Sequence, residues 1–291
     1  MSIPDPRPAT ATSTGKTPPA DTDTGELLAV RELTVRTRTG QALVDGLSFA
    51  IGPGERLGLI GESGSGKSLT SLAALGLLPG GLTAEGSIRL AGTEIVGAPE
   101  KRLVKVRGRD AAIVFQEPLT ALDPLMRVGR QIAGPLARHQ GLKGAALRSA
   151  VTGALEQVRL PDPERIARAR PHEISGGQRQ RVALAMALAC APRLLIADEP
   201  TTALDVTVQA ELLGLLDTLV QERNMSLLFI SHDLAVVAGI ADRVVVMKDG
   251  RAVEEGSVRD VVGAPRDPYT AALVDSARTL EDALERRKAA R

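Results

Sequence analysis

Short apolar segments predict strands in the first part of the chain. Residues 27–35 and 42–51 alternate apolar and polar positions, which predicts a small antiparallel edge sheet. A third apolar segment, residues 56–60, follows the turn Gly52-Pro53-Gly54 and leads into a glycine-rich loop. Because apolar residues then recur at helical spacing from about Lys67, we expect a strand, a loop and a helix in succession.

Apolar runs in the rest of the chain predict strands that alternate with helices. This alternation is typical of α/β proteins, in which helices cover a mostly parallel sheet. We therefore expect an α/β fold with a mostly parallel sheet and an N-terminal antiparallel β subdomain. The further strands are expected at residues 87–90, 111–115, 193–197, 226–230 and 243–247, with a helix at 208–222.

The stretch from Pro124 to Pro171 has no strand pattern. Its apolar spacing predicts helices at residues 130–139, 145–158 and 164–169. We interpret residues 124–176 as a helical subdomain inserted into the α/β domain.

The two ends of the chain differ in composition from its middle. Residues 1–25 are rich in Pro and Thr and lack the apolar region of a secretory signal, so we expect a disordered tail. We place the main domain at residues 26–264 and a C-terminal extension at 265–291. The extension contains Pro265 and Pro268 and then a helix of mixed charge, which we interpret as a solvated face.

Charge and aromatic content restrict the function classes. The chain of 291 residues has 36 Lys and Arg against 35 Asp and Glu, so no overall field attracts nucleic acid. The aromatic residues are Phe49, Phe115, Phe229 and Tyr269, and there is no Trp. Recognition of nucleic acid by base stacking is therefore not expected.

The cysteine count and the length of the apolar runs restrict the cofactors and the location of the protein. Cys190 is the only cysteine, so an intrachain disulfide is impossible and no Cys/His metal cluster is expected. This composition suits a reducing cytosol. The longest apolar run, residues 182–191, is much shorter than the roughly 20 residues that span a bilayer. We therefore do not expect a membrane-spanning subunit.

Residues 61–68, GESGSGKS, match the phosphate-loop pattern G-x-x-x-x-G-K-[ST]. The loop follows an apolar strand and precedes a helix, which is the context that this pattern requires. We expect backbone N–H groups and the helix N-terminus to surround nucleotide phosphates, with Lys67 between phosphates and Ser68 on Mg²⁺. The alternative is a glycine-rich turn that happens to contain lysine.

An apolar strand ends in the acidic pair Asp198-Glu199. The carboxyl end of a strand is where α/β proteins bind ligands. We expect Asp198 to hold the water shell of Mg²⁺ and Glu199 to polarise a water aimed at the γ-phosphate. Without the phosphate loop upstream, the same pair could equally be a loop that caps a helix.

The segment Ser175-Gly176-Gly177-Gln178 begins a second helix, expected to continue to Ala191, whose N-terminus could receive an anion. The alternative is an ordinary helix cap by Ser175 with a basic first turn. Because this segment lies more than a hundred residues from the phosphate loop, contact of both with one nucleotide is most easily imagined across two chains arranged head to tail.

These motifs together resemble the ATP-binding subunits of ABC transporters, over about residues 27–273. The phosphate loop, the signature Ser175–Gln178, the Asp198-Glu199 end of the Walker B strand, the D-loop 202–205 and the switch His232 occur in the family's order. Phe115-Gln116-Glu117-Pro118 is similar to the family's Q-loop, which senses Mg²⁺ and the γ-phosphate. A lone histidine such as His232 is more often structural, and only its position after a strand indicates this role.

The resemblance implies a role for each matching residue. Asp205 would form a dimer contact, and two ATP molecules would lie at the interface of two ATPase subunits. ATP would be bound by Gly61, Glu62, Ser63, Gly64, Ser65, Gly66, Lys67, Ser68 and Leu69, and by Ser175, Gly177 and Gln178 of the opposite subunit. Catalysis would involve Glu199, His232 and Gln116, and Mg²⁺ would be held by Ser68, Gln116 and Asp198.

Several segments resemble the importer branch for di- and oligopeptides, which has nickel importers among its near relatives. These segments are residues 61–68 with 76–79, 116–124 and 265–270. The resemblance implies a peripheral ATPase on the cytoplasmic face of the membrane. Its partners would be a second ATPase subunit, identical or paralogous, two permeases and an extracytoplasmic solute-binding protein.

Two departures from the family pattern are visible. Residues 35–39 lack the aromatic that stacks on adenine, and Arg36 or Arg38 could stack in its place. The C-terminal segment also has no cysteine, so no iron–sulfur cluster is expected.

Other functions remain open at this point. A soluble ABC ATPase of DNA repair or the ribosome usually has two cassettes or a long coiled coil, whereas this chain has one cassette and no sustained heptads. A switch that binds ATP without hydrolysis is opposed by the presence of Glu199 and His232.

Overall fold

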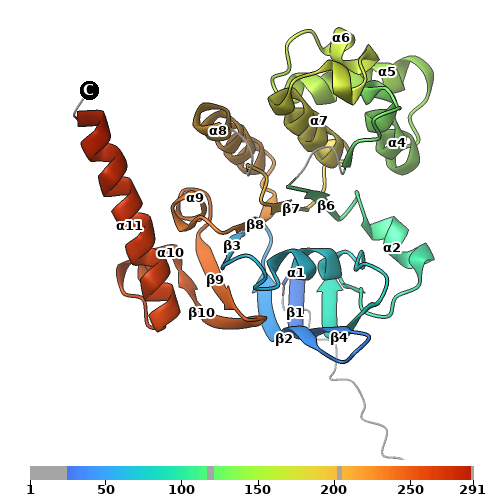
Figure 1. Cartoon of the computed structure of the whole chain (residues 1–291). Coiled ribbons are helices and arrows are strands. Elements are labelled where there is room, and N and C mark those ends of the chain that lie inside the picture. Colours follow the sequence, from blue (N-terminus) through green and yellow to red (C-terminus); the bar gives the residue numbers. More distant parts are fainter. Residues whose placement is uncertain (1–24, 117–120, 202–204, 290–291) are drawn as a thin grey trace, which may run out of the picture.

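Two sheets with surrounding helices form the framework of the protein (Figure 1). The structure, a computed structural model, describes residues 25–116, 121–201 and 205–289. Residues 1–24 of the expected N-terminal tail lie outside the described residues. The α/β organisation predicted from the sequence is confirmed.

A six-stranded, mostly parallel sheet lies at the centre. Its strands are β3 (Arg56–Ile60), β6 (Ala111–Val114), β7 (Leu194–Asp198), β8 (Ser226–Ser231), β9 (Arg243–Lys248) and β10 (Arg251–Ser257). They lie in the order β10-β9-β3-β8-β7-β6, with β10 antiparallel to β9 and the others parallel. Every residue of β7 and β8 is buried, because helices or the second sheet cover both faces.

The two faces of the central sheet contribute to two separate cores. Side chains alternate along a strand, so Leu195 of β7 and Leu227 of β8 lie in one core and their neighbours Leu194 and Leu228 in the other. Phe229, fully buried, is the bulkiest of the fully buried side chains among the described residues. Most of the core is aliphatic, as the low aromatic content predicts.

The second sheet is the expected antiparallel one, extended by two strands. Its strands are β1 (Leu28–Thr37), β2 (Ala42–Ile51), β4 (Leu82–Leu90) and β5 (Thr93–Glu94), in the order β2-β1-β4-β5. β4 begins five residues before the predicted position 87, because antiparallel pairing with β1 continues to Thr37 opposite Leu82. The segment that pairing adds contains Thr83, Glu85 and Gly86 and has no strand pattern of its own.

A group of helices lies apart from the sheets (Figure 1). It comprises α4 (Val128–Gln140), α5 (Gly144–Gln157), α6 (Pro163–Arg168) and the 3₁₀ helix η1 (Pro171–Glu173), with α7 (Gly176–Leu188) between the group and the sheet. The three helices predicted here are confirmed within two residues at each end. The division of the chain into domains remains a prediction.

Helix α7 ends earlier than the apolar run predicts. The run continues to Ala191, but the helix ends at Leu188. Ala191 has a φ of +50° and donates its N–H to the Leu188 carbonyl at 3.0 Å, which forms the turn into β7. The chain must reverse here so that β7 can pair in parallel with β8, and this tertiary requirement ends the helix.

The remaining helices cover the central sheet or follow it. They are α1 (Lys67–Ala74), α2 (Glu100–Val106), α8 (Val206–Glu222), α9 (Leu234–Ala238), α10 (Val258–Gly263) and α11 (Pro268–Ala289). Sequence periodicity missed α2, α9 and α10, which are too short to show it. Among the described residues, no helix combines the length and the apolar content needed to cross a bilayer.

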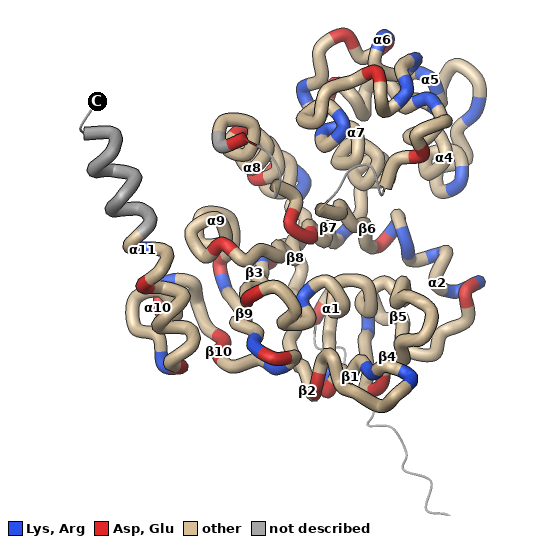
Figure 2. Tube along the Cα trace, in the orientation of Figure 1, with Lys and Arg blue, Asp and Glu red and all other residues tan. Residues whose placement is uncertain are grey.

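Charged residues of both signs occur along the whole described tube (Figure 2). On the separate group of helices, Lys and Arg outnumber Asp and Glu, with nine against four over residues 124–176. The near balance of charges in the whole chain does not extend to this group.

Candidate functional site

The site begins where β3 ends and the chain turns into α1. Gly66 precedes the helix with a φ of +97°, a left-handed conformation that glycine adopts without strain. A Cβ at Gly66 would lie 2.9 Å from Val44 Cγ2 and 3.0 Å from the Leu43 carbonyl oxygen. The loop therefore packs against β2 as closely as a backbone can, and only glycine fits there.

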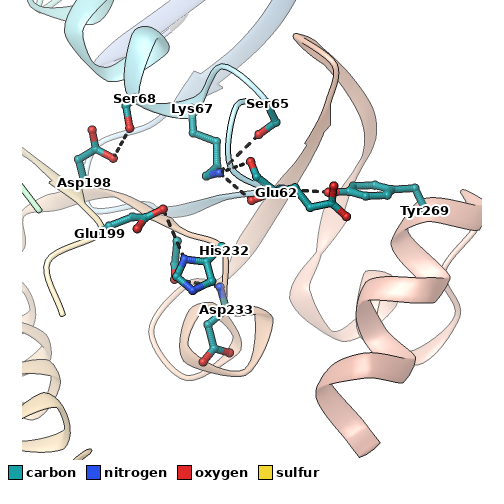
Figure 3. Close-up of polar contacts among 11 residues, drawn as sticks. Glu62, Ser65, Lys67, Ser68, Asp198, Glu199, His232, Asp233 and Tyr269 are labelled. Atoms are coloured by element: carbon teal, nitrogen blue, oxygen red, sulfur yellow. Dashed lines mark hydrogen bonds and ion pairs between the residues drawn. The ribbon is translucent and has the colours of Figure 1, made fainter. Parts of the chain in front are cut away.

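Lys67 is a buried cation, 5% exposed, at the first position of α1. Its Nζ donates to the carbonyl oxygens of Gly61 at 2.6 Å and Glu62 at 2.8 Å, and lies 3.4 Å from Ser65 Oγ (Figure 3). Burial lowers the pKa of the Lys67 ammonium, while nearby carboxylates, led by Glu199, oppose this shift. The loop thus supplies neutral oxygens to a charge that lies at the wall of the site.

Asp198 ends β7 and faces the start of α1. Its Oδ1 accepts a hydrogen bond from Ser68 Oγ at 3.0 Å, and its Oδ2 accepts one from Ser71 Oγ at 3.0 Å. Burial raises the pKa of the Asp198 carboxyl, and the hydrogen bonds from Ser71 and Ser68 partly offset this effect. A carboxylate and a hydroxyl oxygen this close together are the hard donors that Mg²⁺ prefers.

Glu199 and His232 meet across the ends of β7 and β8. The Glu199 Oε1 lies 3.4 Å from His232 Nδ1 (Figure 3). Glu199 has a φ of +47°, and its N–H donates to the Ile230 carbonyl at 2.9 Å. A left-handed glutamate is strained, and the neighbouring strand holds it in this conformation. His232 is 58% exposed and can therefore turn toward a bound group.

These residues surround a cavity of about 740 Å³. The cavity lies between the phosphate loop and the ends of β7 and β8, where the sequence analysis places the site. Of the predicted site residues, its lining contains Glu62, Ser63, Gly64, Gly66, Lys67, Ser68, Leu69, Gln116, Glu199 and His232. Gly61, Ser65 and Asp198 contact these residues directly.

The signature segment lies elsewhere in the chain. Ser175 caps α7: Gln178 N–H donates to Ser175 Oγ at 3.3 Å, and Ser175 N–H donates to Gln178 Oε1 at 3.0 Å. Ser175, Gly177 and Gln178 are not in the lining of this cavity. Ser175 is exposed, so the cap presents its N-terminus outward.

Other predicted elements are described only in part. Asp205 is exposed and caps α8 by accepting from Val208 N–H at 3.0 Å. Residues 202–204 of the D-loop and Glu117 and Pro118 of the Q-loop lie outside the described residues.

The proposed stacking arginines are not part of the cavity lining. Arg36 donates to the Gly40 carbonyl at 3.2 Å and lies 3.7 Å from Glu85. Arg38 lies beside Gly81. In the described part of the chain the half-buried Leu43 lines the cavity instead. No local pattern indicates this role, because Leu43 is an ordinary strand residue until β2 packs against the loop.

Two further residues at the site were not predicted from the sequence. Ser71, one turn after Ser68, contacts Asp198, and a helical spacing of three could have indicated it. The hydroxyl of Tyr269 lies 2.9 Å from Glu62 N, 207 positions earlier in the chain, and no local pattern links them.

The chain is similar to known transport ATP-binding proteins. A family model described as "ABC transporter" matches residues 44–202. Peptidoglycan transport ATP-binding protein YejF of Agrobacterium fabrum is 49% identical over 87% of this chain and 47% of its own length. Oligopeptide transport ATP-binding protein OppD of Bacillus subtilis is 46% identical over 89% of this chain and 74% of its own.

The fold matches a solved structure as well. A dimeric structure of the ATP-binding cassette MJ0796, in a post-hydrolysis state bound to ADP and Pi, superimposes with a TM-score of 0.71. The match covers 80% of this chain and 99% of that one, at 28% identity.

Removal of the Asp198 charge should stabilise the ligand-free fold. Because the folded pKa is raised above 3.8, the folded state holds this proton more tightly than the unfolded chain, and stability falls as pH rises between the two pKa values. We expect Asp198→Asn to melt a few degrees higher at pH 7 without nucleotide or divalent cations, measured by thermal unfolding. Below pH 3.8 this advantage should disappear.

The matched control is Asp205→Asn, an exposed cap that asparagine can also form. It should melt within about one degree of the parent at pH 7. A lower melting temperature for Asp198→Asn at pH 7 would show that its hydrogen bonds outweigh the cost of burying its charge.

Proposed function

The chain belongs to the ABC transporter family, and from this membership we propose that it is the ATP-hydrolysing subunit of an importer. The imported solute would be di- or oligopeptide-like and would move inward through partner permeases. One observation carries the proposal: Lys67, Glu199 and His232 meet at one cavity lined by a phosphate loop. The printed name of the OppD relative, oligopeptide transport, supports the solute class.

ATP would bind with its phosphates against the loop. The N-terminus of α1 and the loop N–H groups other than that of Glu62, which donates to Tyr269, supply positive potential there. Lys67 has three N–H donors and would add phosphate oxygens to its carbonyl partners. The lowered pKa of its ammonium reflects how poorly solvated that charge is without phosphate. Bound phosphate therefore satisfies a charge that the fold buries at a cost.

The residues present fit Mg²⁺ as a cofactor. Ser68 Oγ and Asp198 Oδ1 lie 3.0 Å apart, and Gln116 adds an amide oxygen at the same cavity. These three residues would hold the ion directly or through its waters, with phosphate oxygens completing the shell. When bound, Mg²⁺ would neutralise charge on the transferring phosphate.

Hydrolysis would depend mainly on positioning and electrostatics. Glu199 would accept a hydrogen bond from the attacking water and align it with the γ-phosphate. His232, now beside Glu199 at 3.4 Å, would turn to donate to that phosphate. Gln116 would report the presence of the phosphate and cation to the membrane partner.

A second ATPase subunit would complete the site. Ser175, Gly177 and Gln178 lie outside the cavity of their own chain, so they could hold ATP only on a partner. Two chains arranged head to tail would bury two ATP molecules between them. The dimeric state of MJ0796 supports the pairing of two chains. The partner would be a second copy or a paralogue.

Two permeases and an extracytoplasmic solute-binding protein would be the other partners, and the chain would lie on the cytoplasmic face of the membrane as a peripheral subunit. The chain spans 47% of the length of YejF, so the partners and the solute of this chain are part of our proposal. Nickel or another small solute is the alternative cargo. A soluble ABC ATPase is the alternative class, and the transport names of the relatives oppose it.

Glu199→Gln should separate ATP binding from hydrolysis. Glutamine keeps the size of the side chain but cannot act as a base, so we expect turnover to fall at least about 100-fold with ATP affinity retained. The trapped ATP should hold two chains together, measured as a doubled mass by light scattering in Mg·ATP.

The control is Glu156→Gln, an exposed substitution on α5 that should leave the rate unchanged. Hydrolysis by Glu199→Gln at the parent rate would remove Glu199 from catalysis. Parent and variant that are both inactive and monomeric would indicate that a different ATPase chain supplies the second half of the site.

Leu43 should contribute to nucleotide affinity in place of an aromatic. We expect Leu43→Ala to raise the Kd for ATP about fivefold, through lost apolar contact with the base. Arg36→Ala should stay within about twofold of the parent, because Arg36 is not in the cavity lining. Titration with a fluorescent ATP analogue measures both, and the reverse ranking would restore the arginine as the stacking group.

The chain should be recovered with membranes when its permeases are present. In detergent-free cell fractions, we expect it in the pellet of cells that express the permeases and in the supernatant of cells that lack them. Recovery in the supernatant of both would favour the soluble ABC ATPase.

A further inference from the structure

The C-terminal helix contacts the phosphate loop through one hydrogen bond. Tyr269, in the first turn of α11, places its hydroxyl 2.9 Å from Glu62 N, and Glu62 N–H donates to it (Figure 3). Nothing in the proposed mechanism uses Tyr269. The contact nevertheless joins the segment at residues 265–270 to the loop that would hold phosphate.

The hydrogen bond falls on the peptide group that also holds Lys67. The Gly61 carbonyl and the Glu62 N–H belong to one trans peptide group, so they point in opposite directions. Lys67 Nζ donates to this carbonyl at 2.6 Å from the cavity side, while Tyr269 accepts from the N–H on the other side. The peptide group is therefore held at both edges.

Gly61 by itself restrains the orientation of this peptide group only weakly. Its φ is +154°, and a Cβ there would lie 2.2 Å from the Met247 carbonyl oxygen. The position must be glycine, which leaves the peptide group free to rotate unless a partner holds it. Lys67 Nζ and the Tyr269 hydroxyl supply such partners, one at each edge of the group.

Tyr269 is itself held firmly. The Glu254 carboxylate accepts from the N–H groups of Arg266 at 3.0 Å and Asp267 at 3.0 Å, which fixes the chain just before α11. Lys248 Nζ lies 5.0 Å from the centre of the Tyr269 ring, within cation–π range. Five residues further along α11, Val274 is 1% exposed and packs in the core.

We propose that Tyr269 is a positioning residue for the nucleotide site, and that its hydroxyl fixes the Gly61–Glu62 peptide group in the orientation that directs the Gly61 carbonyl oxygen to Lys67 Nζ. The inference rests on the proposed ATPase function. It assigns to the segment after residue 264 a part in nucleotide affinity. Tyr269 contacts the loop backbone from outside the cavity and touches no reacting atom.

Tyr269→Phe tests this inference because it removes one oxygen and leaves the ring in its packing. In the ligand-free chain, the Glu62 amide should exchange with solvent about three- to tenfold faster, measured by NMR hydrogen exchange. The Kd and KM for Mg·ATP should rise by a similar factor. The kcat should change by less than about twofold, since bound phosphates then orient Lys67 themselves.

The matched control is Lys248→Met, which removes the cation over the ring and leaves the hydroxyl in place. It should leave Glu62 exchange and the Kd within about twofold of the parent. Both single variants should melt within a few degrees of the parent, which separates positioning from loss of folding.

Two results would overturn the inference. One is unchanged exchange of the Glu62 amide in Tyr269→Phe, and the other is a parent-like Kd for Mg·ATP in that variant when the parent binds. Failure of the parent chain to bind Mg·ATP would instead refute the proposed function, and Glu62 exchange would still test the hydrogen bond.

Discussion

Adjacent parallel pairing of β3, β8 and β7 is the constraint on which the site depends. The register places Ile60 opposite Ser231 and Asp198 opposite Ile230. The next residues along β3 and β8 are Gly61 and His232, so the first residue of the loop and the histidine leave the sheet at the same level. A shift of one residue would turn every side chain of a strand to the other face and separate these groups. Because β7 and β8 are buried on both faces, such a shift would also disrupt the packing of both cores, and the cores therefore maintain the geometry of the site.

The same edge of the sheet concentrates charge that is costly to bury. Burial lowers the pKa of Lys67 and raises that of Asp198, so each shift opposes the charged form. Backbone carbonyls and two serine hydroxyls offset part of this cost in the ligand-free chain. A phosphate and a cation would offset more of it, which explains why a site for Mg·ATP can be less stable when empty. Asp198, which bears part of this cost, ends a strand whose residues are all buried.

The site extends beyond the residues that face the cavity. On one side, the cap of α7 presents Ser175 outward, to a partner chain in our proposal. On the other side, Tyr269 of α11 accepts a hydrogen bond from the loop backbone outside the cavity. The loop is thus a short glycine-rich segment that gains its orientation from elements far apart in the chain. Removal of any one of these supports should affect nucleotide binding before it affects the fold.

Local patterns in the sequence were enough for most of the strands, the inserted helices and the phosphate loop, but they did not predict β5 or β10. The spacing of glycines, Lys67 and Ser68 is itself the chemistry, because consecutive N–H groups and a helix N-terminus make the anion site. Asp198 and Glu199 could be recognised because they end an apolar strand. The ends of elements were less predictable: β4 gains its first residues from pairing with β1, and α7 stops at Leu188 so that the chain can return to the sheet. Leu43, the position of Arg36 away from the cavity, and the contact of Tyr269 with Glu62 were decided only by the tertiary structure. Each depends on which backbone packs against the loop, and that packing joins segments up to 207 residues apart that share no local pattern.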